Sequence, residues 1–181
     1  MRNAEFGLQN GKAMRIVSFV AAASNSGKTT LIEKIIPLLK DRGLRVAVVK
    51  HAHAGFEIDR PGKDSWRFRE AGADAVMLIG PDGLALMKPL QDEPLAELEL
   101  LARDVDIVIQ EGFKKTAKNK IEVFRTGISG NQPLSMTDPS FVALVSDAPF
   151  DTTIPRFDIN DIRGITEYLI ATFIDPSRAG I

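Results

Sequence analysis

The sequence predicts a three-layer α/β fold, in which helices cover a mostly parallel β-sheet that also carries an antiparallel hairpin. The first observation is that short apolar runs alternate with segments of helical spacing along the chain. The second is that residues 105–109 are almost continuously apolar, as expected at the centre of a parallel sheet. The third is the turn sequence Pro81-Asp82-Gly83 between two apolar runs, which indicates a hairpin.

The predicted elements follow one another without a linker or an internal repeat. The predicted strands are residues 15–21, 44–49, 75–79, 84–87, 105–109, 121–124 and 141–145. The first helix begins after the first strand and ends at Gly43, which favours the left-handed conformation at a helix end. Further helices are expected from Asp64, from Asp92, and after a cap at Asn160 or Asp161.

The first predicted strand leads directly into a loop that is typical of phosphate binding. The loop residues are Ser24, Asn25, Ser26, Gly27, Lys28, Thr29 and Thr30. A tight turn between a strand and a helix aims backbone N–H groups at phosphate oxygens, and the helix start adds unpaired N–H groups. Lys28 supplies a positive charge for the outer phosphates, and the Thr29 hydroxyl is placed to bind Mg²⁺. We therefore predict a P-loop nucleotide-binding protein, with these residues at the nucleotide.

The first position of this loop differs from the usual pattern, because Ala22 stands where glycine is common. If that position needs a positive φ, alanine costs about 1 kcal/mol. Asn25 is easier to accommodate, because asparagine visits the left-handed region more readily than most residues.

A carboxylate that holds the Mg²⁺ water shell is expected at the carboxyl end of a strand near the loop. Glu111 follows the apolar strand at residues 105–109, whereas Asp106 lies about 16 Å away at the opposite end. We therefore expect Glu111 to act with Lys28 in catalysis and with Thr29 at the metal.

Two other acids are candidates whose roles the sequence leaves open. Asp59 lies in the long polar segment after the second strand, and either binds the metal or hydrogen-bonds its own backbone in a turn near Pro61 and Gly62. Asp147 follows the strand at residues 141–145. It either accepts the N–H pair of a guanine base or is a loop acid beside Pro149.

Length and composition limit the function. With 181 residues the chain is long enough for one domain, which we expect at residues 14–175 between a flexible leader at 1–13 and a tail at 176–181. The net charge of −1 argues against nucleic-acid and membrane binding. The absence of cysteine excludes disulfides and thiolate metal sites. We expect a cytoplasmic protein, since no apolar run approaches the roughly 20 residues of a membrane span.

Four pieces, spread over residues 14–175, resemble the MobB family of molybdopterin-guanine dinucleotide biosynthesis accessory proteins. They are Ser24 to Thr30 with Ile32 to Leu39, the run from Lys50-His51 to Ser65, Ala71-Gly72-Ala73, and Glu111-Gly112-Phe113-Lys114 with Lys120 to Arg125. The resemblance implies a GTP-binding protein with weak GTPase activity that dimerises through extended sheets. It also implies a MobA-type guanylyltransferase as partner, acting when GMP is attached to molybdopterin.

The expected function is therefore that of a Mg²⁺-GTP-binding accessory protein of molybdenum cofactor biosynthesis. A small-molecule kinase is an alternative, which would need an arginine-rich lid over the transferred phosphoryl group. Arg60, Arg67 and Arg69 are the nearest candidates for a lid, and they do not form a clear cluster. A non-catalytic nucleotide-binding adaptor is the other alternative, and turnover with and without a partner would distinguish it.

Overall fold

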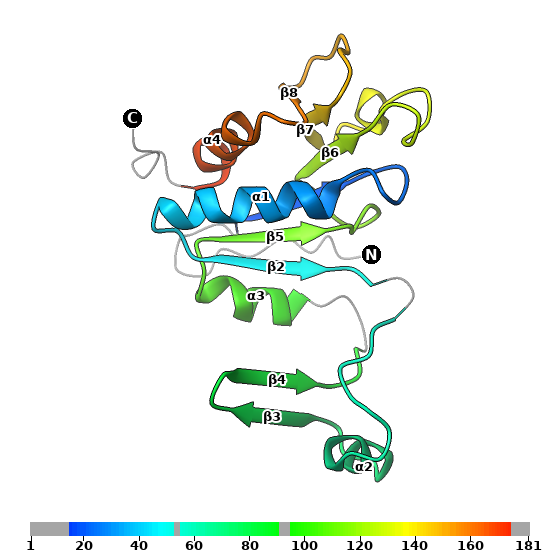
Figure 1. Cartoon of the computed structure of the whole chain (residues 1–181), viewed down its shortest axis with the longest axis vertical. Coiled ribbons are helices and arrows are strands. Elements are labelled where there is room, and N and C mark those ends of the chain that lie inside the picture. The colour runs from blue at the N-terminus through cyan, green and yellow to red at the C-terminus, as the bar shows by residue number, and fades with distance from the viewer. Residues whose placement is uncertain (1–14, 53–54, 91–94, 175–181) are drawn as a thin grey trace, which may run out of the picture. The chain divides into compact units, whose positions relative to one another are not determined.

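The computed structural model describes residues 15–52, 55–90 and 95–174 (Figure 1). These residues divide into two compact units, one formed by the described residues up to His51 and from Leu98 onward, and the other by the described residues between Ala52 and Glu97. The predicted leader at 1–13, the tail at 176–181 and the predicted helix start at Asp92 lie outside the described residues.

The larger unit contains a six-stranded sheet in which every pair of neighbouring strands is parallel. The strand order is β2-β5-β1-β6-β7-β8. The strands are β1 (Ile16–Val20), β2 (Val46–Lys50), β5 (Ile107–Glu111), β6 (Lys120–Phe124), β7 (Phe141–Ser146) and β8 (Arg156–Asp158). The prediction of a mostly parallel sheet is confirmed.

This strand order fixes where a ligand can bind. Because all six strands run in the same direction, their carboxyl ends lie at one edge of the sheet. The chain order reverses at β1, which pairs with β5 on one side and β6 on the other. Open α/β sheets bind ligands at such a reversal, beyond the carboxyl ends of the strands.

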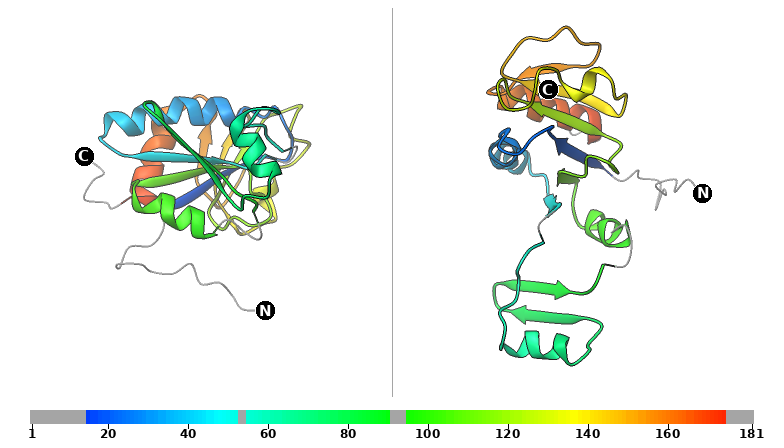
Figure 2. Two further views of the ribbon diagram at one scale, coloured as in Figure 1. Left: turned by 90° about the horizontal axis from the view of Figure 1, so that it is seen from below. Right: turned by 90° about the vertical axis from the view of Figure 1, so that its right-hand side faces the viewer.

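Helices pack on both faces of this sheet. Helix α1 (Lys28–Asp41) contacts α4 (Ile162–Phe173), and the two lie side by side in Figure 1. Helix α3 (Leu95–Arg103) lies on the face opposite to α1 (Figure 2). Asp161 caps α4, since its side chain accepts a hydrogen bond from the Gly164 N–H at 2.9 Å. The core contains fully buried side chains from both layers: Phe19, Ile35, Leu39, Ile109, Ile121, Leu169 and Ile170.

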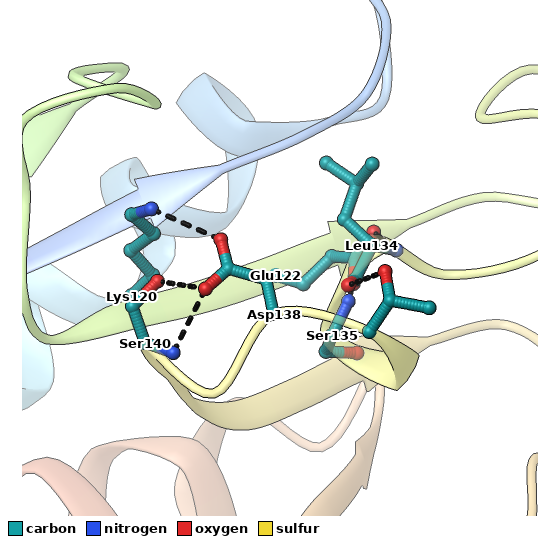
Figure 3. Close-up of polar contacts among 7 residues, drawn as sticks. Lys120, Glu122, Leu134, Ser135, Asp138 and Ser140 are labelled. Atoms are coloured by element: carbon teal, nitrogen blue, oxygen red, sulfur yellow. Dashed lines mark hydrogen bonds and ion pairs between the residues drawn. The ribbon is translucent and has the colours of Figure 1, made fainter.

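Strand β6 is buried along its whole length, including the charged residues Lys120 and Glu122, whose polar contacts are shown in Figure 3. The Glu122 carboxylate accepts the N–H groups of Leu134 and Ser135 at 2.8 and 2.7 Å, at the start of the short 3-10 helix η1 (Leu134–Met136). Lys120 pairs with Asp138 at 3.2 Å. These charges therefore hold the β6–β7 connection in place, and Lys120 does not belong to an exposed basic surface.

The smaller unit contains helix α2 (Asp64–Glu70) and an antiparallel hairpin of β3 (Val76–Gly80) and β4 (Gly83–Met87). The predicted hairpin is confirmed, and it forms its own two-stranded sheet. The helix expected from Asp64 is confirmed, but Asp64 does not cap it. Asp64 is the first helical residue, and Lys63 occupies the cap position without a side-chain hydrogen bond.

Strand β8 was not predicted. It has only three residues, two of them exposed, and it depends on backbone pairing with β7 rather than on an apolar pattern. Among the described segments, no helix is both long enough and apolar enough to span a membrane.

Candidate nucleotide-binding site

The loop between β1 and α1 adopts a tight turn at the carboxyl edge of the sheet. Asn25 and Gly27 have left-handed backbones, with φ of 62° and 88°. Asparagine and glycine are the residues that tolerate this conformation most easily. Ala22 has no positive φ in this loop, so the expected strain at that position is absent. The side chains of Ser24, Asn25, Thr29 and Thr30 are exposed.

The first N–H groups of α1 are available to a ligand. The Gly27 carbonyl accepts the N–H of Leu31 at 2.9 Å, so the regular helical ladder begins there. The N–H groups of Lys28, Thr29 and Thr30 precede that first bond and have no helical acceptor. They give this edge of the sheet a cluster of donors and the positive end of the helix dipole.

Ser26 differs from the other loop residues because its side chain is fully buried. Its hydroxyl donates to the Ala23 carbonyl at 2.9 Å and lies 3.2 Å from the Ser129 hydroxyl. The Ser26 side chain thus shapes the loop, and only its backbone N–H is left to face a phosphate.

Lys28 is held over the loop and is partly buried. Its Nζ lies 3.4 Å from the Ala23 carbonyl. Burial lowers the pKa of Lys28 below its ordinary value of 10.5, although the Glu111 carboxylate acts in the opposite direction. A bound phosphate would restore the favourable environment for this charge.

Strand β5 brings Glu111 to the loop. The Thr29 hydroxyl donates to Glu111 Oε1 at 2.7 Å, and Lys50 Nζ at the end of β2 lies 3.5 Å from Oε2. Asp106 lies at the amino end of β5, where its carboxylate accepts the Arg45 N–H at 2.9 Å. The structure therefore places Glu111, and not Asp106, beside Thr29.

The chain turns sharply directly after Glu111. Gly112 and Phe113 have φ of 99° and 59°. A left-handed backbone costs a residue such as phenylalanine about 1–2 kcal/mol. The Phe113 ring packs edge-on against His51 at 5.1 Å, and a side chain on Gly112 would lie 3.3 Å from the His51 Cβ. These contacts keep the end of β5 close to the end of β2.

Asp147 follows β7 at the same edge of the sheet. Its Oδ1 accepts two hydrogen bonds from Thr126, one from the backbone N–H and one from the hydroxyl, both at 2.9 Å. The backbone hydrogen bond is the main cause of a pKa of Asp147 below its usual value. The carboxylate is thus ionised and held in position after β7, while its part in base recognition stays a prediction.

Asp59 belongs to the smaller unit. Its Oδ1 accepts the Arg60 N–H at 2.9 Å and the Ser65 hydroxyl at 2.8 Å, which is a structural role of the kind expected in a turn. Its Oδ2 is buried without a hydrogen bond, 3.9 Å from an Arg69 nitrogen. Its part in a metal site shared with Thr29 and Glu111 stays a prediction.

The donor set around Thr29 fits Mg²⁺. A hydroxyl and a carboxylate are hard oxygen ligands, and Mg²⁺ in nucleotide sites takes one or two protein oxygens together with phosphates and water. Within the described part of the chain there is no group of three or more histidine, aspartate or glutamate residues that could hold a metal ion.

Two residues near the loop were not assigned from the sequence. Lys50 faces Glu111, and Arg125 follows β6 with its guanidinium next to Gly27. Each of them directly follows a predicted strand, and this position was the indication in the sequence that they could lie near the loop. The sequence could not show that β6 lies beside β1, because strand order is set by tertiary packing.

The comparisons with known proteins agree with this geometry. The MobB family model, described as "Molybdopterin guanine dinucleotide synthesis protein B", matches residues 16–147. A molybdopterin-guanine dinucleotide biosynthesis adapter protein of Escherichia coli (strain K12) is 37% identical over 88% of this chain and 94% of its own length. The adapter protein of Haemophilus influenzae is 36% identical over 83% of this chain and 85% of its own length.

The chain is also similar to solved structures of MobB proteins. A crystal structure of molybdopterin-guanine biosynthesis protein B (mobB) has a TM-score of 0.67 and 32% identity, covering 87% of this chain and 98% of its own. Bacillus subtilis MobB has a TM-score of 0.66 and 25% identity, with 88% and 98% covered. On these sequence and structural matches, the chain belongs to the MobB family.

Proposed function

We propose that this protein binds Mg²⁺-GTP at the carboxyl edge of its parallel sheet and acts as an adapter in molybdopterin-guanine dinucleotide biosynthesis. The observation that carries the proposal is the 2.7 Å contact between the Thr29 hydroxyl and the Glu111 carboxylate, directly beside Lys28. These three groups come from two different strand ends, and together they offer one cation and two hard oxygen ligands.

Different residues would bind the phosphates, the Mg²⁺ ion and the base. The backbone N–H groups at the start of α1 and the Lys28 ammonium would bind the phosphates. Thr29 and Glu111 would hold Mg²⁺, whose charge offsets that of the phosphate oxygens when it is bound. Lys50 Nζ lies 3.5 Å from Glu111 Oε2 and offsets part of its charge. Asp147 would accept the N–H groups of guanine, and this contact would favour GTP over ATP.

A slow GTPase activity fits these residues better than kinase activity. A kinase would need a lid of arginines over the transferred phosphoryl group. Among the described residues, the lid candidates Arg60, Arg67 and Arg69 all belong to the smaller unit. Arg67 there pairs with Asp64, and Arg69 with Asp59. Family membership further supports action with a MobA-type guanylyltransferase, which attaches GMP to molybdopterin.

The direct test is reconstitution with a MobA-type guanylyltransferase, molybdopterin and Mg²⁺-GTP. The rate of dinucleotide formation should rise when the wild-type protein is added, and should not rise with Lys28→Ala. An unchanged rate with the wild-type protein would contradict the proposed role. Stimulation without GTP turnover by this protein would instead favour a non-catalytic adaptor.

We also propose that two copies of the chain associate through the β3–β4 hairpin. Its apolar side chains are exposed on both faces, including Ile79 at 80% and Leu84 at 69%. An isolated two-stranded hairpin is marginally stable in water, and exposed apolar residues on it favour burial by a partner. A second copy offers the same surface, as an isologous dimer requires.

Light scattering after size-exclusion chromatography tests this association. The wild-type protein should have the mass of a dimer, and Ile79→Lys with Leu84→Lys should give a monomer. Leu100→Lys is the matched control, because Leu100 is similarly exposed on α3 at 61%. A wild-type monomer at micromolar concentration would exclude the proposed dimer.

A further inference from the structure

Arg125 lies at the phosphate loop, on the side opposite to Glu111. It follows directly on β6, which pairs with β1, whereas Glu111 ends β5 on the other side of β1. A methyl group built on Gly27 would lie 3.8 Å from Arg125 Nη2 and 4.0 Å from Cζ. The guanidinium therefore lies beside the position that a side chain on the loop's left-handed glycine would take.

One polar group of this side chain has no partner among the described residues, since Arg125 Nε is buried without a hydrogen bond. In the same part of the chain no carboxylate lies within ion-pair distance of the guanidinium, although the Asp147 carboxylate is near enough to interact with its charge. A buried donor without an acceptor is unfavourable, and such groups in native proteins commonly have a functional explanation.

The backbone fixes Arg125 in this position. Its N–H donates to the Ser129 hydroxyl at 2.9 Å, and its carbonyl accepts the N–H groups of Ile128 and Ser129 at 3.1 and 2.9 Å. The Ser129 hydroxyl in turn lies 3.2 Å from that of the fully buried Ser26. The backbone turn that carries Arg125 is thus tied to the phosphate loop.

We propose that Arg125 is a second cationic phosphate ligand, which binds an oxygen of the nucleotide's phosphate chain on the Gly27 side of the loop. The inference rests on the proposed nucleotide site and adds a residue to it. A guanidinium is always charged and presents several N–H donors in one plane, so it matches phosphate oxygens well. Lys28 and Arg125 then approach the phosphates from different elements, α1 and the end of β6.

The test is calorimetric titration with Mg²⁺ and either GTP or inorganic triphosphate. Arg125→Gln should weaken binding of both ligands about ten- to a hundredfold, because a charge-assisted contact to phosphate is lost. Its dissociation constant should also depend less on salt concentration than that of the wild type. Arg125→Lys should be weakened less and should keep the wild-type salt dependence.

Arg42→Gln is the matched control. It removes the same charge at the far end of α1, about 20 Å from Lys28 by helix rise, and should leave both affinities unchanged. If Arg125→Gln does not fold, Arg125→Met replaces it, since methionine keeps the apolar stem of the side chain.

The outcomes separate this inference from the proposed function. If the wild type binds and Lys28→Ala does not, the nucleotide site stands, and wild-type affinity in Arg125→Gln then overturns the role of Arg125. Equal weakening by glutamine and lysine with unchanged salt dependence also overturns it, because the side chain would then only support the loop. If the wild type binds neither ligand, both proposals fail.

Discussion

Lys28 is the residue at which burial and charge oppose each other most directly. Burial lowers its pKa, so the fold disfavours the ammonium form relative to the unfolded chain. This penalty is present below the folded-state pKa and is relieved as the pH rises through that pKa towards 10.5. Stability therefore does not account for a lysine at this position.

Lys28→Ala should weaken Mg²⁺-GTP binding by about 1.5–3 kcal/mol or more without lowering the melting temperature. Calorimetry and thermal unfolding measure the two effects. Lys34→Ala is the control, since Lys34 is exposed on the same helix. Wild-type affinity in Lys28→Ala would exclude the phosphate loop as the binding site.

Glu111 and Asp106 lie at opposite ends of the same strand, so substitutions of the two residues should have different effects. Glu111→Gln should remove most of the Mg²⁺ dependence of binding, because a neutral amide is a poorer magnesium ligand. Asp106→Asn should instead lower stability by about 1.5–3 kcal/mol, because its carboxylate accepts from both the N–H and Nε of Arg45. Mg²⁺ titrations and denaturant unfolding curves of both variants measure these two effects. If both variants lost the Mg²⁺ dependence of binding to the same extent, the assignment of Glu111 as the metal ligand would be wrong.

Asp147 should remain ionised to a lower pH than an ordinary aspartate. Its lowered pKa comes first from the Thr126 backbone N–H and in part from the Thr126 hydroxyl. Its contribution to stability is thus present above the unfolded-state pKa and is lost as the pH falls through the folded-state pKa. Thr126→Val should raise the pKa only in part, since the backbone hydrogen bond remains. A carboxyl NMR titration measures this, and an unchanged pKa would show that the hydroxyl has no effect.

At the scale of elements, the phosphate loop tolerates alanine at its first position because the left-handed backbone lies at other positions of the loop. Asn25 and Gly27 have the positive φ angles, and Ala22 does not. Ala22→Gly should therefore leave GTP affinity unchanged within about twofold, whereas Asn25→Val should weaken it, since β-branched residues strongly disfavour this conformation. Titration of both variants checks this. Tighter binding by Ala22→Gly would show that glycine is needed at the first position after all.

The elements that the sequence predicted best are those with a clear apolar pattern. The predicted strands at residues 105–109 and 141–145 correspond to β5 and β7, which are buried along almost their whole length. The exposed three-residue β8 has no such pattern and was missed. The cap at Asp161 could be predicted because its side chain bonds locally, whereas Asp64 could have been either a cap or a first-turn residue.

At the scale of the whole molecule, the sequence could place site residues at strand ends but could not order the strands. Glu111 was predictable because it follows an apolar strand, and the structure adds that β5 is the neighbour of β1. Arg125 and Lys50 approach the site only through the order β2-β5-β1-β6, which long-range pairing decides. Family resemblance provided the expected GTP and partner, which no local pattern contains.

We propose that this chain holds Mg²⁺-GTP at Lys28, Thr29 and Glu111, with a preference for guanine at Asp147. The most direct measurement is a calorimetric comparison of GTP and ATP binding to the wild-type protein, with and without Mg²⁺. GTP should bind about ten- to a hundredfold more tightly than ATP, as expected for a charged contact to the base, and Asp147→Asn should reduce this preference. Equal affinity for GTP and ATP, or binding that does not depend on Mg²⁺, would contradict the claim.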